Sequence, residues 1–371
     1  MSGSLVDRAA LLGAGIRGEA QRIEDLGRLP DDVVASLVDT EAMRMFVPTD
    51  LGGPALDVPT GMRVIEEFGR HDGAVGWCVA IAATTSMLAS YLPDPFAEAI
   101  YGDARAVTGG FAAPVGRAEA VDGGLRVSGR WAWGSGITHC TWIGGGVMAD
   151  DGPRFVFFEP EQVELLGGWD VAGLRGTGSV DYAVSDAFVP TGRGARLGVD
   201  RPTRPGPITT FSQFGLLASG IAATSLGIAE RSIEELVTLA AAKRPQGSRR
   251  VLADRSATQA EVARADGQLR AARALFHDAI GTAWERAVDG DAGDDDRMAI
   301  RLAAVHAAQS AVAVTSAMFG LGGGAAIHRT SALQRCWRDA AVAAQHAMVA
   351  PRVLEPLGRV RLGLETDLRQ L

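Results

Sequence analysis

Residues 106–136 have the sequence AVTGGFAAPVGRAEAVDGGLRVSGRWAWGSG, and this stretch decides which fold class the chain adopts. Its apolar runs are short and are separated by glycine-rich turns, a pattern typical of strands. The Asp-Gly-Gly of residues 122–124 lies between two such runs and predicts a tight hairpin. Because the same pattern continues to Pro190, we predict a middle β domain over residues 106–200.

The segments on both sides of this stretch have a helical pattern, since their apolar residues recur three and four positions apart. After the proline-rich residues 202–207 the predicted helices are longer than in an ordinary globular domain, which is typical of a four-helix bundle. We therefore predict an α+β chain in which an N-terminal helical domain (1–105) and a C-terminal helical bundle (201–371) flank the β domain. The expected helices cover residues 6–26, 30–42, 58–71, 74–91, 94–103, 208–243, 255–289, 295–319 and 331–360.

The 371-residue chain is acidic, with 36 lysines and arginines against 44 aspartates and glutamates and a formal net charge of −8. Binding to nucleic acid needs a basic surface, so this balance argues against a nucleic-acid partner. Hydrophobic residues make up 47% of the chain and charged residues 22%, which excludes intrinsic disorder as a description of the whole protein.

The cysteines and the uncharged stretches limit the location of the protein. Cys78, Cys140 and Cys336 form no CxxC pair, and the histidines show no metal-ligand spacing, so we predict no metal site and a reducing cytoplasm. Residues 74–92 and 205–229 carry no charge and approach the length of a bilayer span. Because both are rich in small residues, we interpret them as buried helices and expect no membrane partner.

Passages spread over nearly the whole chain resemble the acyl-CoA dehydrogenase superfamily of flavoproteins. Residues 46–77 (FVPTDLGGPALDVPTGMRVIEEFGRHDGAVGW) are similar to that family's Gly-Gly turn and the helices after it. Residues 129–142 (GRWAWGSGITHCTW) and 169–190 (WDVAGLRGTGSVDYAVSDAFVP) are similar to its middle domain. Residues 319–346 (FGLGGGAAIHRTSALQRCWRDAAVAAQH) are similar to its C-terminal glycine turn and arginine-aspartate helix. The resemblance implies the family's fold, with a β-barrel-like domain between the two helical domains.

Within that superfamily, SGRWAWGSG and GLRGTGS are most similar to the oxygenase components of two-component flavin-dependent monooxygenases, such as the hydroxylases of 4-hydroxyphenylacetate and of secosteroid phenols. This resemblance implies an oxidoreductase that receives reduced flavin (FMNH2 or FADH2) from a separate reductase and uses O2 through a flavin C4a-hydroperoxide. The implied substrate is small, largely apolar and aromatic. A flavin site completed by a neighbouring subunit would make the protein a homodimer or homotetramer.

Trp133 and Ser135 are the candidate flavin contacts in the β domain. They alternate on one expected strand, so both side chains can point to the same face. On spacing alone, a tryptophan of the sheet core and a turn serine are the more common interpretation. The resemblance instead assigns Trp133 to the flavin ring and the hydroxyl of Ser135, as a cofactor-binding and catalytic group, to the N5 side of the flavin.

Gly322, Gly323 and Gly324 follow an expected helix, and their bare backbone N–H groups could approach a phosphate. A glycine run of this kind is more often only a helix end. In the resembled family the equivalent turn meets the phosphate portion of the flavin across a subunit interface, so Gly322 and Gly323 are candidate cofactor contacts. Arg244 corresponds to the family's interfacial arginine, although the following Phe-Gly turn is missing and Arg249 or Arg250 could replace it.

His346 is the candidate catalytic residue near the end of the chain. Acyl-CoA dehydrogenases carry a carboxylate base a few residues after the arginine-aspartate helix, whereas here no acidic residue occurs between Asp339 and Glu355. The monooxygenases carry a histidine beside the reactive edge of the flavin at about this position. A neutral imidazole can donate or accept a proton there. Without the resemblance, a histidine on a helix face of the bundle core would be the simpler interpretation.

Two alternatives and the substrate remain open at this stage. Glu230, Glu234 and Glu235 on the first bundle helix could supply the base of an FAD-containing acyl-CoA dehydrogenase, and a non-catalytic scaffold that has lost flavin affinity is the second alternative. Phenol hydroxylases of this branch carry a substrate-binding histidine in the helix after GAVGW, where this chain has Thr85 and Ser86 as candidate substrate contacts. Oxygenation at nitrogen or sulfur therefore stays possible beside oxygenation at carbon.

Overall fold

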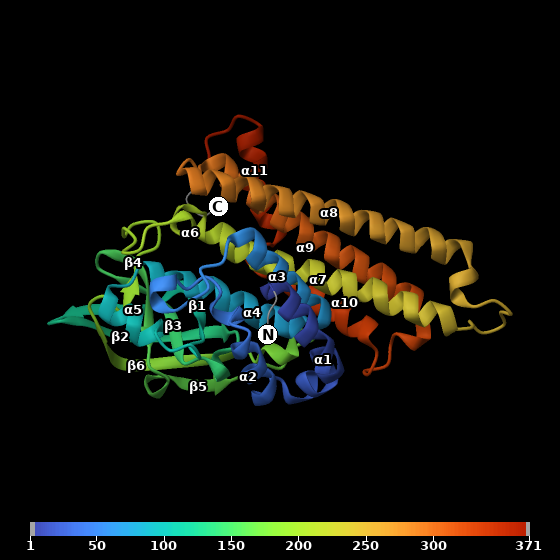
Figure 1. Cartoon of the computed structure of the whole chain (residues 1–371), viewed down its shortest axis with the longest axis horizontal. Helices are drawn as coiled ribbons and strands as arrows, with labels where there is room; N and C mark the ends of the chain where they lie inside the picture. Colours follow the sequence, from blue (N-terminus) through green and yellow to red (C-terminus); the bar gives the residue numbers. More distant parts are fainter. Residues whose placement is uncertain (1–3, 369–371) are drawn as a thin grey trace.

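The computed structural model describes residues 4–368 and confirms the expected order of helical, sheet and helical parts. In Figure 1 the strands lie at the left, the long C-terminal helices extend to the right, and the N-terminal helices lie between them. The N-terminal helices are α1 (Leu5–Leu26), α2 (Asp31–Asp39), α3 (Val58–His71), α4 (Gly73–Ser86) and α5 (Asp94–Tyr101), with the short 3-10 helices η1 (Ala42–Arg44), η2 (Thr49–Leu51) and η3 (Met87–Ser90).

The middle of the chain forms one seven-stranded sheet with the strand order β5-β6-β2-β1-β3-β4-β7. Val121 pairs with Gly124, so the predicted hairpin turn between β1 and β2 is confirmed. β1 pairs with β3 in parallel, and the other neighbouring strands are antiparallel. The elements are β1 (Thr108–Val121), β2 (Gly124–Gly134), η4 (Ile137–His139), β3 (Trp142–Ala149), β4 (Gly152–Phe158), η5 (Pro160–Gln162), β5 (Glu164–Gly167), η6 (Arg175–Thr177), β6 (Val180–Pro190) and β7 (Gly194–Ala195).

The C-terminal part is a bundle in which α9 packs against α7, α8 and α10. The expected single helix over 208–243 is wrong, because Ser212 interrupts it and caps α7 with its side chain. The expected helix over 331–360 is also wrong, since α10 ends at Ala343 and a non-helical segment precedes Pro351. The elements are α6 (Pro207–Thr210), α7 (Gln213–Ala242), η7 (Leu252–Asp254), α8 (Ser256–Asp289), α9 (Asp294–Gly322), η8 (Gly323–Ala325), α10 (Ala332–Ala343), η9 (Pro351–Val353) and α11 (Leu354–Arg361).

Small residues let α3 and α7 touch through their backbones. A Cβ atom added at Gly227 would lie 2.2 Å from the Glu66 carbonyl oxygen, and one at Gly69 would lie 2.7 Å from the Thr224 carbonyl oxygen. A larger side chain at either glycine would push the two helices apart. Small residues of the second uncharged stretch therefore allow close packing of α7 on α3.

Within residues 4–368, two helical segments are long and apolar enough to cross a membrane by length and composition alone, namely Gly73–Ser90 and Asp294–Ala325. In the first, 94% of the apolar window is buried inside the protein, and in the second 56% is buried. Because buried core helices have the same composition as membrane spans, these two segments are weak evidence for a membrane protein.

Candidate functional site

Three side-chain hydroxyl groups form a chain that leads from the end of β2 into the protein interior. Trp77 on α4 donates its indole N–H to Ser135 Oγ at 2.9 Å, and Ser135 Oγ lies 2.8 Å from Ser179 Oγ. Ser179 Oγ lies 2.7 Å from Thr177 Oγ1, which in turn lies 2.8 Å from the Leu174 carbonyl oxygen. We call Ser135, Ser179 and Thr177 the hydroxyl chain. Ser179 and Thr177 are buried and Ser135 is half-buried, so Ser135 is the end accessible to a ligand.

Trp133 lies two residues before Ser135 in a strained backbone conformation. Its φ angle is 60°, its side chain is 63% exposed, and the pairing of β2 with β6 shifts between Trp131 and Gly134. The expected alternation of Trp133 and Ser135 along one strand is therefore wrong, since Ser135 lies in the turn after β2. A left-handed conformation costs a non-glycine residue roughly 1–2 kcal/mol, and strain of this kind concentrates at ligand sites.

His346 lies in the segment after α10, with its ring against Trp77. The two ring centroids are 5.7 Å apart with an interplanar angle of 67°. The Met348 backbone N–H donates to His346 Nδ1 at 3.2 Å, so the neutral ring carries its hydrogen on Nε2. Burial, assisted by the charge of Arg301, lowers the pKa of His346 to about 4. The structure therefore brings His346 and Ser135 to the same tryptophan, with the imidazole neutral at pH 7.

Arg301 on α9 provides a second polar group next to this segment. It is 2% exposed, and its guanidinium contacts the Phe214 carbonyl oxygen at 3.4 Å and Met348 Sδ at 3.1 Å. Burial lowers the pKa of Arg301 to about 10, and no ion pair joins it to a carboxylate within residues 4–368. Its positive charge favours the neutral form of His346, because protonation would place two cations close together.

The other predicted cofactor residues lie at the far end of the bundle. The loop after α7, which contains Arg244, extends beyond the helices at the right of Figure 1, whereas the strands lie at the left. Lys243 in this loop donates to the Gly322 carbonyl oxygen, and the Arg244 guanidinium donates to the Arg249 carbonyl oxygen at 2.7 Å. The structure thus brings the loop of Arg244, through Lys243, to Gly322 and Gly323, and this loop and the strands lie at opposite ends of Figure 1.

Thr85 and Ser86, the predicted substrate contacts, lie on α4 two turns after Trp77. The Thr85 hydroxyl donates to the Ile81 carbonyl oxygen at 2.7 Å, and the Ser86 hydroxyl donates to the Ala83 carbonyl oxygen at 2.7 Å. Thr85 is half-buried, whereas Ser86 is fully buried. Both hydroxyl hydrogens are therefore bonded to the helix, so these hydroxyl groups can only accept a hydrogen bond from a ligand.

The carboxylates of α7 are held in ion pairs with arginines. Glu234 pairs with Arg17 at 2.7 Å and also with Arg70, and Glu230 pairs with Arg273 at 2.8 Å. Both carboxylates are therefore bound by arginine side chains and are not free. The third candidate, Glu235, forms an ion pair with Arg231 at 2.6 Å, and burial raises its pKa.

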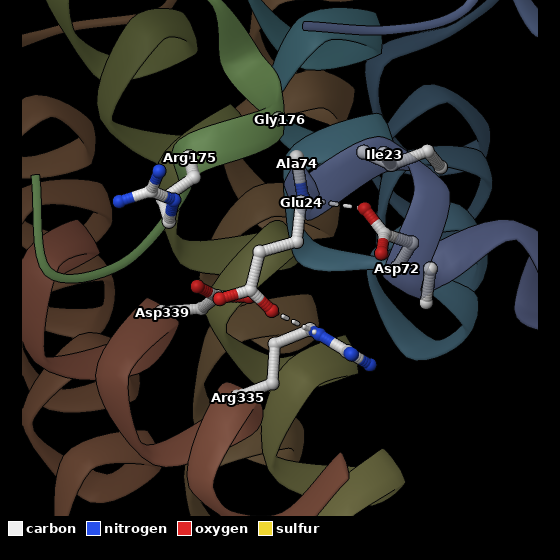
Figure 2. Close-up of a pocket in the computed structure, with 9 residues that line it drawn as sticks. Ile23, Glu24, Asp72, Ala74, Arg175, Gly176, Arg335 and Asp339 are labelled. Atoms are coloured by element: carbon white, nitrogen blue, oxygen red, sulfur yellow. Dashed lines mark hydrogen bonds and ion pairs between the residues drawn. The ribbon is translucent and has the colours of Figure 1, made fainter. Parts of the chain in front are cut away.

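A separate group of charged side chains lines a small cavity among α1, α4, η6 and α10 (Figure 2). Glu24 accepts from Arg335 Nε at 2.7 Å and from Arg338 Nη2 at 2.5 Å, and Asp339 accepts the Leu174 backbone N–H at 2.6 Å. We call Glu24, Arg335, Arg338 and Asp339 the charged junction. Burial raises the pKa of Asp339 to about 7. Burial acts to raise the pKa of Glu24 as well, but the two arginines outweigh it and lower that pKa.

Sequence reasoning missed four residues of these sites: Trp77, Thr177, Ser179 and Arg301. Trp77 ends the GAVGW segment, and Thr177 and Ser179 belong to GLRGTGS, so the motifs that identified the family already contained them. Arg301 had a weaker signal. A lone arginine among apolar residues of a predicted bundle helix is a candidate for a buried charge.

Comparison with known proteins gives a consistent result over the whole chain. The family model described as "Acyl-CoA dehydrogenase, N-terminal domain" matches residues 10–93, and "Acyl-CoA dehydrogenase, C-terminal domain" matches residues 219–351. Indole-3-acetate monooxygenase of Pseudomonas putida is 32% identical over 96% of this chain and 91% of its own length. The oxygenase subunit HsaA of a flavin-dependent monooxygenase from Rhodococcus jostii is 30% identical over 91% and 92% of the two chains. The crystal structure of 3-HSA hydroxylase from Rhodococcus sp. RHA1 superposes with a TM-score of 0.90 at 26% identity, covering 99% of both chains.

Proposed function

The chain belongs to the acyl-CoA dehydrogenase superfamily, among the oxygenase components of flavin-dependent monooxygenases, and we propose that it adds one oxygen atom of O2 to a small, largely apolar aromatic substrate. The observation that carries this proposal is a neutral imidazole, not a carboxylate, against Trp77, whose indole N–H also donates to Ser135. On α7, Glu230 and Glu234 are bound by arginines, which argues against either one as the free carboxylate base that an acyl-CoA dehydrogenase needs.

The residues around Ser135 fit a flavin. Trp133 presents an exposed indole face, and Ser135 offers a hydroxyl oxygen that is open on one side. Reduced flavin, the cofactor of this family, supplies the electrons that activate O2. Trp133 would cover the ring and Ser135 would contact its N5 edge, as the resemblance implies.

His346 would act on the substrate side of the same site. Its Nε2–H forms no hydrogen bond with another residue of the described chain, so it is free to donate one to a ligand oxygen or to exchange a proton with the substrate. It is largely buried near the cation of Arg301, and the exclusion of water from such a site would favour transfer of oxygen to the substrate over the release of hydrogen peroxide. Thr85, half a helix away on α4, would contact the substrate, with Ser86 packed behind it.

The separation of the two predicted cofactor regions supports an assembly of several copies. The turn of Gly322 and Gly323, with Lys243 and Arg244 beside it, offers positive charge and backbone N–H groups suited to a phosphate. Because the loop after α7 and the strands lie at opposite ends of Figure 1, we propose that this end serves the flavin of a neighbouring subunit in a homodimer or homotetramer. A separate reductase would deliver the reduced flavin in the cytoplasm, and the three free cysteines are compatible with a reducing compartment.

A labelling experiment tests the proposed reaction. Protein mixed anaerobically with chemically reduced FMN or FAD is exposed to ¹⁸O2 in the presence of indole-3-acetate or another small aromatic compound. We expect one ¹⁸O atom in the organic product, detected by mass spectrometry. Bleaching of protein-bound oxidised FAD by an acyl-CoA, with no labelled product from any aromatic compound, would instead identify a dehydrogenase.

A His346→Ala variant tests the role of the imidazole. We expect the yield of product per reduced flavin to fall by about 100-fold while hydrogen peroxide rises, since positioned acid-base groups contribute about 10²–10⁴-fold. His306→Ala on the exposed face of α9 is the matched control and should keep the wild-type yield. Because the pKa of His346 is lowered to about 4, the yield of the wild type should be constant from pH 6 to 8. A steep loss between pH 7 and 6 would contradict the neutral imidazole.

A further inference from the structure

We infer that the hydroxyl chain fixes Ser135 as a hydrogen-bond acceptor toward the cofactor, so that Thr177 and Ser179 make the site select reduced over oxidised flavin. The inference rests on the proposed function, since it assigns the N5 edge of the flavin to Ser135. It concerns two buried positioning residues that do not themselves reach the cofactor.

The direction of the chain follows from its two ends. The Leu174 carbonyl oxygen can only accept, and it also accepts the Thr177 backbone N–H at 3.1 Å and the Trp169 indole N–H at 3.2 Å. The Thr177 hydroxyl lies nearer than either, at 2.8 Å, and two oxygens this close need a hydrogen between them, so the hydroxyl hydrogen points to the carbonyl. Thr177 Oγ1 is then an acceptor for the contact of 2.7 Å with Ser179, which must donate its own hydrogen there. An oxygen pair at this distance without a hydrogen between them would bring two lone pairs together, which is repulsive.

The same reasoning continues outward to Ser135. Because the Ser179 hydrogen is used toward Thr177, the contact of 2.8 Å between Ser179 and Ser135 requires that Ser135 donate. At the other end, the indole N–H of Trp77 can only donate, and it occupies one lone pair of Ser135 Oγ at 2.9 Å. One lone pair of Ser135 remains, and it can only accept.

The two redox states of flavin differ in what N5 offers to this lone pair. Reduced flavin carries a hydrogen on N5 and can donate it to Ser135. Oxidised flavin has a lone pair at N5, which would face the lone pair of Ser135 without a hydrogen. We therefore expect reduced flavin to bind at least tenfold more tightly than oxidised flavin, from one hydrogen bond gained and one repulsive contact avoided. An oxygenase that must take up reduced flavin and let oxidised flavin go benefits from this difference.

Thr177→Val tests the direction of the chain without touching Ser135. The substitution is nearly isosteric and removes the acceptor of the Ser179 hydrogen, so Ser179 can donate to Ser135 and free the Ser135 hydrogen for N5 of oxidised flavin. Anaerobic titrations with oxidised and with dithionite-reduced FMN and FAD give both dissociation constants. We expect the constant of oxidised flavin to tighten by roughly three- to tenfold and that of reduced flavin to stay within twofold of the wild type.

The reduction potential of the bound flavin gives an independent readout. The relevant ratio is the dissociation constant of oxidised flavin divided by that of reduced flavin. A tenfold fall in this ratio lowers the two-electron midpoint potential of the bound flavin by about 30 mV. Thr177→Ser keeps the hydroxyl and should keep the wild-type ratio and potential. If Thr177→Val does not fold, Ser179→Ala asks the same question, since it also frees the Ser135 hydrogen.

The outcomes separate the inference from the proposed function. Equal weakening of both redox states in Thr177→Val or Ser179→Ala, with an unchanged potential, would show a merely structural role and overturn the inference. A wild-type protein that binds reduced and oxidised flavin equally well would also overturn it, although the protein could still be an oxygenase. A wild-type protein that binds neither redox state would instead reject the proposed function.

Discussion

The charged junction and the hydroxyl chain both bind the backbone of Leu174, the junction at its N–H and the hydroxyl chain at its carbonyl oxygen. Asp339 of the junction accepts the Leu174 N–H at 2.6 Å, and Thr177 of the chain donates to the Leu174 carbonyl oxygen at 2.8 Å. Leu174 itself has a φ angle of 53°, which a leucine adopts only when its surroundings impose it. The two regions together therefore fix the loop that carries Thr177 and Ser179.

The difference between them lies in their charge. The junction joins α1 to α10 with one carboxylate between two guanidinium groups, where strong directional bonds are useful. The hydroxyl chain is uncharged along its whole length, so it orients Ser135 without adding a second charge to that of Arg301, which already lowers the pKa of His346.

Removing Glu24 gives the largest expected effect on stability. Glu24→Ala leaves the partly buried Arg335 and Arg338 without a carboxylate, and we expect a loss of about 3 kcal/mol in the free energy of unfolding. Urea denaturation followed by circular dichroism measures it. Asp31→Ala, which breaks an exposed ion pair with Arg28, is the control and should cost less than about 1 kcal/mol. Equal losses in the two variants would mean that the junction is no stronger than a surface ion pair.

Asp339→Asn probes the pH dependence of the junction. Burial raises the pKa of Asp339 to about 7, so between about pH 4 and 7 the folded protein holds a proton that the unfolded chain releases. This contribution to stability is present at pH 4 and is lost as the pH rises through 7. Asparagine keeps an acceptor for the Leu174 N–H but does not titrate. Between pH 5 and 8, the free energy of unfolding of the variant should therefore fall by about 1–3 kcal/mol less than that of the wild type.

Chemical denaturation across that pH range measures the difference between the two proteins. Asp289→Asn, at the exposed end of α8, is the matched control and should follow the wild-type curve. If Asp339→Asn parallels the wild type as well, Asp339 is ionised in the folded protein at neutral pH and the junction carries one more negative charge than we infer.

Substitutions of Trp133 give the smallest expected effect on stability. They test the backbone strain two residues before Ser135 of the hydroxyl chain. Glycine accepts a φ angle of 60° more easily than alanine, so Trp133→Gly should be about 0.5–1 kcal/mol more stable than Trp133→Ala after its greater flexibility in the unfolded chain is counted. Thermal unfolding measures this difference. Flavin affinity should fall equally in both variants, because both remove the indole. An alanine variant as stable as the glycine variant would show that the backbone at this position is unstrained.

Much of the fold was predictable because periodicity and turn chemistry are local. The helix expected over residues 58–71 and the turn at residues 122–124 occur where their patterns placed them. The break after Ala343 was not predictable in this way, since the apolar pattern continues through it. Contacts with distant segments accompany it, among them the contact of the Arg301 guanidinium on α9 with Met348 Sδ at 3.1 Å.

The candidate site divides along the same line. The amino-acid sequence by itself determined the family, the absence of an acidic residue between Asp339 and Glu355, and the identity of His346 and Ser135 as candidates, because these are properties of residue type and order. Only the tertiary structure decided that Trp77 stands between them, that Trp133 is strained, and that buried hydroxyls fix the hydrogen-bond direction of Ser135. Ser135 meets Trp77 and Ser179 from segments 58 and 44 residues away, and no local pattern in the sequence brings those groups within 3 Å of it.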